Sequence, residues 1–229
     1  MNLSPVFIAM FVAFMALGIT FTIRASINAK KRTQALQSFA QENGLEFAAG
    51  NLTAPIDAQT ALFDRGGSGR FLNIMSGNWS SLKITAFDYK YTISSGKNSS
   101  TFVQTVAAFT QQLPLPWFEL RPEGFLDRVG ERFVHRDINF ESNPQFSRRY
   151  MLRGKNQDAV RTLFAPALLS YLEMLPAGDW LHIEADASTL LMYRFNVQVK
   201  VEDLRAFLDD LSGIASTFLS SCGKPVGQA

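Results

Sequence analysis

Residues 81–109 read SLKITAFDYKYTISSGKNSSTFVQTVAAF, and this stretch decides the fold. Two runs rich in β-branched and aromatic residues flank the polar segment SSGKNSS, which is the pattern of an antiparallel hairpin. In the first run Leu82, Ile84 and Ala86 share one face, whereas the apolar residues from Phe87 onward lie on the other. A β-bulge, or a strand covered on both faces, accounts for this switch.

Strand patterns continue on both sides of this hairpin. FLNIM is joined to it through the turn residues SGNWS and predicts a second hairpin. Shorter runs predict further strands: LEFAAG at 45–50, PWFELR at 116–121 and FSRRYML at 146–152. The first half of the chain is therefore expected to form an antiparallel meander.

Two helices and two strands are expected in the second half. Residues 156–176 have apolar side chains at helical spacing, and Pro166 should kink or split that helix. WLHIEA at 180–185 and LLMYRFNVQV at 190–199 read as strands, the second with strict alternation of apolar and polar residues. The residues from Glu202 to Phe218 form an amphipathic helix. These elements predict an α+β fold with a mainly antiparallel sheet and two helices in the C-terminal half.

The N-terminal segment is the most apolar part of the chain. Residues 5–23 carry no charge, and as a helix they would rise about 28 Å, close to the thickness of a bilayer core. We therefore expect a transmembrane helix; a cleaved signal peptide would need a basic region before a shorter apolar run. The positive-inside rule then places the C-terminal domain in the cytoplasm and the short N-terminus outside, and the alternative is that the domain is exported.

A basic helical stalk is expected over 24–43, ending before Gly44. Four cations follow the apolar run: Arg24, Lys30, Lys31 and Arg32. They are candidates for binding anionic lipid headgroups, and the alternative is that they only set the topology.

The expected organisation is a short tail at 1–4, the span at 5–23, the stalk at 24–43, one soluble domain at 44–220 and a flexible tail at 221–229. A chain of 229 residues has room for one such domain and a segment beside it. The basic N-terminal region leaves the rest of the chain with a slight excess of acidic residues, so we expect no nucleic-acid partner. The single cysteine, Cys222, excludes an internal disulfide.

The tripeptide GKN occurs at 96–98 and at 154–156 and raises the question of phosphate binding. A nucleotide-binding loop of the GxxxxGK type needs a glycine five residues before the Gly-Lys pair. Tyr91 and Arg149 occupy those positions. Both copies are therefore interpreted as turns.

Candidate catalytic residues are sparse. His135 with Asp137, and His182 with Glu184, each lie two residues apart, a spacing compatible with an acid–base pair or, together with Glu141, a metal site. The alternative is a histidine that lies near a carboxylate by chance, and no nucleophile motif is present. We expect no metal ion and no cofactor. The mixed run of arginines and acids from Arg121 to Arg153 predicts an ion-paired surface.

Two surfaces are candidates for binding. Lys97 and Asn98 at the hairpin tip, with Trp117 and Phe118 in LPLPWFEL, are candidates for contact with a protein partner. The alternative for the latter pair is a packed edge strand. Tyr89, Tyr91 and their apolar neighbours are the basis of a third hypothesis, a lipid or small-ligand binder.

The segments AFDYKYT, SGKN, LPWFELRPEGF, INFESNPQFSRRYML and LLMYRF together resemble a group of uncharacterised bacterial proteins. Those proteins have one N-terminal membrane segment and a single soluble domain, and the likeness covers most of residues 70–220. The resemblance implies no activity and no functional residue. The leading hypothesis is thus a single-pass protein of the bacterial inner membrane whose cytoplasmic domain is a non-catalytic binding or scaffolding domain. The alternatives are a membrane-tethered hydrolase or metal-dependent enzyme and a lipid or small-ligand binder.

Overall fold

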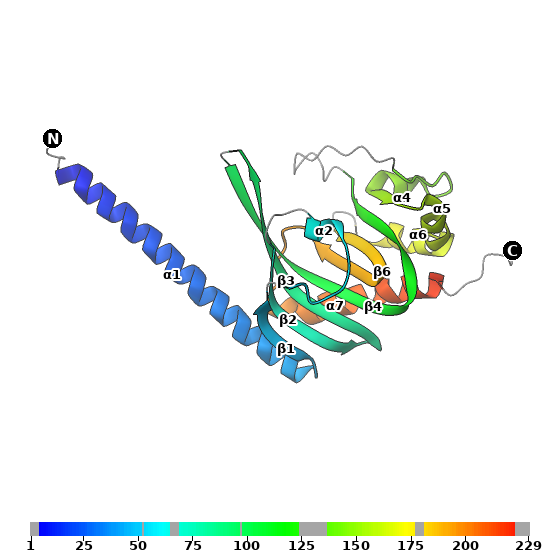
Figure 1. The fold of residues 1–229 in the computed structure, drawn as a ribbon, viewed down its shortest axis with the longest axis horizontal. Coiled ribbons are helices and arrows are strands. Elements are labelled where there is room, and N and C mark those ends of the chain that lie inside the picture. Colours follow the sequence, from blue (N-terminus) through cyan, green and yellow to red (C-terminus); the bar gives the residue numbers. More distant parts are fainter. Residues whose placement is uncertain are drawn as a thin grey trace.

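A computed structural model describes residues 5–51, 53–64, 69–96, 98–123, 137–176 and 181–222. The first element is α1, Pro5–Glu42, a single helix of 38 residues and thus about 57 Å long. Figure 1 shows it projecting from the rest of the molecule and touching it at its C-terminal end. There Leu36 and Ala40 are buried, and Phe39 stacks on Trp79 with ring centroids 6.0 Å apart.

The expectation of a transmembrane helix over 5–23 is wrong. No helix in the described part of the chain is long and apolar enough to cross a membrane. The run contains Gly18, Thr20 and Thr22 among its apolar residues and is followed directly by Arg24. The single-pass assignment is withdrawn with it, and the cytoplasmic placement loses its basis.

A six-stranded antiparallel sheet forms the centre of the globular part of the molecule. We call this part, the described residues that follow α1, the head. Its strands are β1 (Glu46–Asn51), β2 (Arg70–Trp79), β3 (Leu82–Ser95), β4 (Asn98–Pro122), β5 (Tyr150–Gly154) and β6 (Leu181–Arg194). The order is β1-β2-β3-β4-β5, and β6 pairs with β4. β4 is the central strand of the sheet: β3 pairs with its first half, β5 with its end, and β6 with the part from Val106 to Leu120. Figure 1 shows it as one long curved strand.

Apart from α1, only the last of the described helices, α7 (Leu204–Cys222), is long. The others are α2 (Ala61–Asp64), α4 (Pro144–Arg149), α5 (Gln157–Leu163), α6 (Pro166–Met174) and the 3₁₀ turn η1 (Val201–Asp203). The expected helix at 156–176 is therefore split at Pro166. The expected strand at 146–152 is half wrong, because Pro144 starts a helix there and β5 begins at Tyr150.

The hairpins agree with the sequence, with two differences. Ser80 and Ser81 have φ values of 48° and 67° and form the turn between β2 and β3. The turn thus lies at the end of the segment SGNWS (76–80), and the residues before it belong to β2. The two last strands are one, β6, which ends at Arg194. The strict alternation expected over 190–199 fails because both faces of β6 are covered at Leu190–Tyr193, while Val197 is exposed.

Each face of the sheet carries its own core. The larger core lies between the sheet and α5, α6, α7 and the end of α1. The smaller core lies on the opposite face under α2, where Leu62 is buried and Phe63 packs edge-on against Phe71 and Tyr89. The switch of apolar face along β3 thus comes from a strand covered on both faces, and the irregular register lies in β2, between Leu72 and Met75.

Candidate functional site

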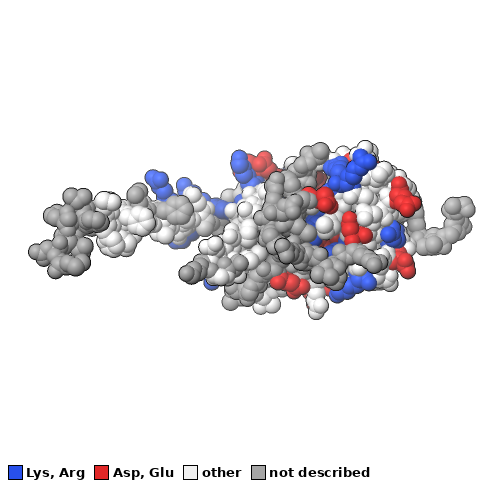
Figure 2. All heavy atoms as spheres, turned by 90° about the horizontal axis from the view of Figure 1, so that it is seen from above, with Lys and Arg blue, Asp and Glu red and all other residues white. Residues whose placement is uncertain are grey.

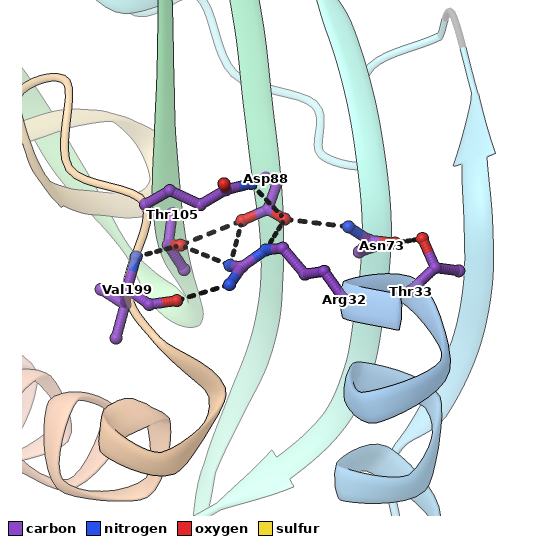
Figure 3. Close-up of polar contacts among 7 residues, drawn as sticks. Arg32, Thr33, Asn73, Asp88, Thr105 and Val199 are labelled. Atoms are coloured by element: carbon purple, nitrogen blue, oxygen red, sulfur yellow. Dashed lines mark hydrogen bonds and ion pairs between the residues drawn. The ribbon is translucent and has the colours of Figure 1, made fainter. Parts of the chain in front are cut away.

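A buried polar network joins α1 to the sheet (Figure 3). Its centre is Asp88 on β3, whose side chain is 1% exposed, and its cation is Arg32 on α1, 16% exposed. The Arg32 guanidinium donates from Nε to Asp88 Oδ2 and from Nη2 to Oδ1, each at 2.8 Å. This two-pronged geometry is the strongest arrangement open to an arginine and a carboxylate.

Three further segments complete the network. Arg32 Nη1 donates to the carbonyl of Val199 at 2.7 Å, after β6. Thr105 on β4 donates its hydroxyl to Asp88 Oδ1 at 2.9 Å and accepts from the backbone N–H of Val199 at 3.0 Å. On β2, Asn73 donates to Asp88 Oδ2 at 2.9 Å and accepts from the hydroxyl of Thr33 at 2.8 Å. The end of α1 is thereby fixed to β2, β3, β4 and the segment after β6.

Local backbone geometry makes this possible. Asn73 has φ 53° and lies in the irregular part of β2, between Leu72 and Met75. Asparagine tolerates this left-handed conformation better than most residues, and the irregularity turns its amide toward β3. The Gln198 amide supplies one more donor to Asp88 Oδ2, at 3.1 Å.

The Asp88 carboxylate therefore accepts five hydrogen bonds. Removing two charges from water costs free energy that a buried ion pair recovers only when its geometry and additional hydrogen bonds are good. All five donors come from the protein itself, so the carboxylate serves as a structural acceptor. The network is suited to fixing one position and direction of α1.

A second buried charge group lies where β4, β5 and β6 pair. Glu119 on β4 is 1% exposed and forms an ion pair with Arg153 on β5. Arg121, also 1% exposed, has Nη1 3.7 Å from Glu119 Oε1 and directs Nη2 toward the sulfur of Met151. The expectation that Arg121 and Arg153 belong to an ion-paired surface is therefore wrong for these two, because the pairing of β4 with β5 buries them beside Glu119.

His182 and Glu184, two of the predicted catalytic residues, lie together in this region. Glu184 accepts hydrogen bonds from the Tyr193 hydroxyl at 2.6 Å and from the backbone N–H of Leu62 at 3.0 Å. The His182 ring stacks on Tyr193 with centroids 4.9 Å apart. Both residues are buried, at 0% and 1% exposure, so Glu184 ties α2 to the sheet in a place that water does not reach.

Asp137 lies apart from that pair, at the outer edge of β5. Its Oδ1 accepts from the backbone N–H of Leu152 at 2.8 Å. Burial raises its pKa, against the opposing effects of hydrogen bonds and of the Arg121 charge. His135 lies outside the described residues, so the pairing of His135 with Asp137 stays a prediction.

Tyr89 lies in the smaller core and has a displaced pKa. Burial raises the pKa of its hydroxyl to about 12, and the nearby Tyr91, Asp64 and Glu184 act in the same direction. At neutral pH this hydroxyl is a neutral packing group. Tyr89 and Tyr91 are each 1% exposed, so they form part of a core under α2.

The four predicted headgroup cations separate into two groups. Arg24, Lys30 and Lys31 are exposed on α1. Arg32 points into the head and forms an ion pair with Asp88. Figure 2 shows Lys and Arg along the visible part of α1 and both signs of charge over the head.

The predicted partner-binding residues also separate. Asn98 is exposed at the start of β4, and Lys97 lies outside the described residues. Trp117 is half-buried and donates from Nε1 to the carbonyl of Gln59 at 3.1 Å, with the Lys155 ammonium 5.2 Å from its ring centroid. Phe118 is fully buried between Phe164 and Phe218, which leaves it no surface for a partner.

The central residues of the α1 network were not singled out from the sequence. One signal was available: Asp88 is the only acidic residue in the predicted strand LKITAFDYKYTI, and a carboxylate in a strand covered on both faces requires a cation. Within the described ranges, no group of three or more His, Cys, Asp or Glu side chains is arranged to hold a metal ion.

Comparison with known proteins gives one structural likeness. No protein-family model and no curated protein matches the chain. The crystal structure of the mycobacterial trehalose monomycolate transport factor A, TtfA, matches with a TM-score of 0.58 and 14% sequence identity. The match covers 86% of this chain and 98% of that chain. At this identity the likeness shows that the two proteins share a fold.

Proposed function

We propose that this protein is a non-catalytic binding or scaffolding domain, in which α1 is a rigid arm that holds a protein partner. The observation that carries the proposal is the network around Asp88. It fixes the arm to three strands and to the segment after β6 through a single buried carboxylate.

The surface of the arm supports a binding role. Large apolar side chains are exposed along it: Met10, Phe11, Phe14, Met15, Ile19, Ile23 and Ile27. Contiguous exposed apolar surface on a soluble protein marks an interaction site. A partner with an apolar surface of its own would cover these side chains, and a fixed arm would present them in one direction.

The interior supports the absence of catalysis in the proposal. Asp88 and Glu119 are bound by arginines, and Glu184 is bound by Tyr193 and by a backbone N–H. Each carboxylate has a structural partner and lies where a substrate would first have to displace a covering element. The structural neighbour is named a transport factor, and we extend to this chain a role of that general kind, in which a domain positions other components.

Photo-crosslinking in living cells tests the proposal. A crosslinking amino acid replaces Phe14 or Ile23, both exposed on the arm, in the full chain. We expect the same partner from both positions and a loss of that partner in Arg32→Lys, which keeps the charge but loses the two-pronged contact. Lys31→Gln, exposed next to it, is the matched control and should leave the crosslinks unchanged.

Two results would contradict the proposal. Repeated recovery of this chain without a crosslinked partner would remove the binding role. Equal crosslinking in the Arg32→Lys variant and the wild type, with both folded by circular dichroism, would remove the rigid arm from it.

A further inference from the structure

Two cations face each other on the sheet beyond the point where α1 is attached. Arg70 at the start of β2 and Lys90 on β3 are directly opposite in the antiparallel register. Both are exposed. Like charges directly opposite each other destabilise a strand pair. Such a pair is unfavourable for the sheet on its own and becomes favourable when an anion lies between the two charges.

A cavity of about 350 Å³ opens at this pair. Thr92 and Thr101, the neighbouring cross-strand pair, also line it. Alternation along β3 places Lys90 and Thr92 on the same face of the sheet. The two threonine hydroxyls are 2.9 Å apart and share one hydrogen bond. One hydroxyl hydrogen of the pair is therefore left to donate to a ligand.

No acidic side chain lines the cavity. The nearest carboxylate along β3 is Asp88, two residues before Lys90. It accepts hydrogen bonds from Arg32 and from three neutral side chains of the network. Among the described residues, Arg70 and Lys90 have no acidic partner. The positive charge of the cavity is therefore available to a ligand.

We propose that this cavity binds a phosphomonoester. Two cations match the two negative charges of that group, and arginine and threonine supply the hydrogen-bond donors that its oxygens accept. A volume of about 350 Å³ is at the lower end of small-ligand pockets, and it accommodates the phosphate together with part of the group that carries it. This site is independent of the partner-binding arm, since it uses none of the exposed apolar residues of α1.

Calorimetric titration of the full chain tests the site. The probes are glycerol 3-phosphate, a soluble phosphomonoester, and dimethyl phosphate, a phosphodiester with a single charge. We expect glycerol 3-phosphate to bind more tightly than dimethyl phosphate. In Arg70→Gln/Lys90→Gln its affinity should fall about tenfold or more, because charge-assisted hydrogen bonds are lost.

The matched control is Lys83→Gln/Lys155→Gln, which removes the same charge from two exposed positions outside the cavity. It should bind glycerol 3-phosphate as the wild type does. A second measurement needs no ligand: in phosphate-free buffer the Arg70→Gln/Lys90→Gln variant should melt at the same temperature as the wild type or higher, because a repulsive pair is removed.

Flotation with vesicles of phosphatidylcholine, with and without phosphatidic acid, separates the two sources of a phosphomonoester. Binding of glycerol 3-phosphate identifies a soluble ligand, and binding that requires phosphatidic acid and is lost in Arg70→Gln/Lys90→Gln identifies a lipid headgroup. The proposal is overturned if the wild type binds neither glycerol 3-phosphate nor the vesicles with phosphatidic acid, or if the cavity variant and the control variant lose equal affinity. A cavity variant that melts well below the wild type also overturns it, because the two cations would then be structural.

Discussion

Asp88 is the residue on which the attachment of α1 depends. It lies 56 positions after Arg32 in the chain. The Asp88 side chain of this pair is fully buried, and the Arg32 side chain is partly exposed. Breaking a buried pair by removing one partner is costly, because the other charge stays buried without compensation. The effect of a substitution here therefore depends on whether it leaves one charge or none.

The first prediction concerns this pair. Arg32→Met should lower the free energy of unfolding by about 3 kcal/mol, because Asp88 loses its counter-charge. Asp88→Asn added to it should cost less than the sum of the two single changes, since the asparagine carries no charge and still accepts hydrogen bonds. Urea denaturation of the wild type, the two single variants and the double variant measures the coupling.

Lys31→Met is the control for this cycle. Lys31 is adjacent to Arg32 but exposed, and its loss should change stability by less than about 0.5 kcal/mol. Additive effects of Arg32→Met and Asp88→Asn would show that the ion pair makes no special contribution.

At the scale of elements, β4 holds the head together. It pairs with β3, β5 and β6 and supplies residues to both cores, with Phe118 on the face toward α7 and Glu119 on the other. Phe118 packs against Phe164, which follows α5, and Phe218 of α7, at centroid distances of 5.1 and 5.7 Å. This one side chain of β4 therefore connects the sheet to two helical segments.

We predict that Phe118→Ala lowers the free energy of unfolding by about 3–5 kcal/mol, because it leaves a cavity among aromatic rings. Trp117→Phe, at the preceding residue, should lower the free energy of unfolding by about 1 kcal/mol, since it keeps a ring and loses the hydrogen bond to Gln59. Chemical denaturation of both variants gives the comparison. Similar small losses for both would contradict the packing role of Phe118.

At the scale of the whole molecule, the protein is an arm and a head that meet at one end of the arm. Figure 1 shows α1 and the β3–β4 hairpin diverging from the region where the arm is attached. The direction of the arm depends on a few contacts at its C-terminal end, namely Leu36, Phe39 and Ala40 in the core and Arg32 on Asp88. We expect the packing to fix where the arm lies and the ion pair to limit its rotation and tilt.

Spin labels at Ser26 on the arm and Ser99 on the hairpin, after Cys222→Ser, test this arrangement. Both label positions are exposed. We predict a narrow distance distribution between the labels in the otherwise unchanged chain and a broader one with Arg32→Gln, because the arm is then held by packing alone. Lys31→Gln is the control and should leave the distribution narrow. Equally narrow distributions in all three chains would show that the ion pair does not restrain the arm.

What the sequence by itself determined is local. Alternation and turn residues predicted the α+β class and the hairpins β2–β3 and β3–β4, Pro166 predicted the break between α5 and α6, and the apolar stripe predicted α7. These patterns depend on residues close together in the chain. The apolar run at 5–23 predicted a helix for the same reason, but its assignment to a membrane was wrong.

Only the tertiary structure decided where the charged residues go. The sequence shows a run of cations and scattered carboxylates, and it does not show that Arg32 pairs with Asp88 or that Arg153 pairs with Glu119. The tertiary structure also brings His182 beside Tyr193, buries Phe118 and sets Arg70 opposite Lys90. Such partners are set by strand register and by which element covers each face, and these follow from packing over the whole chain.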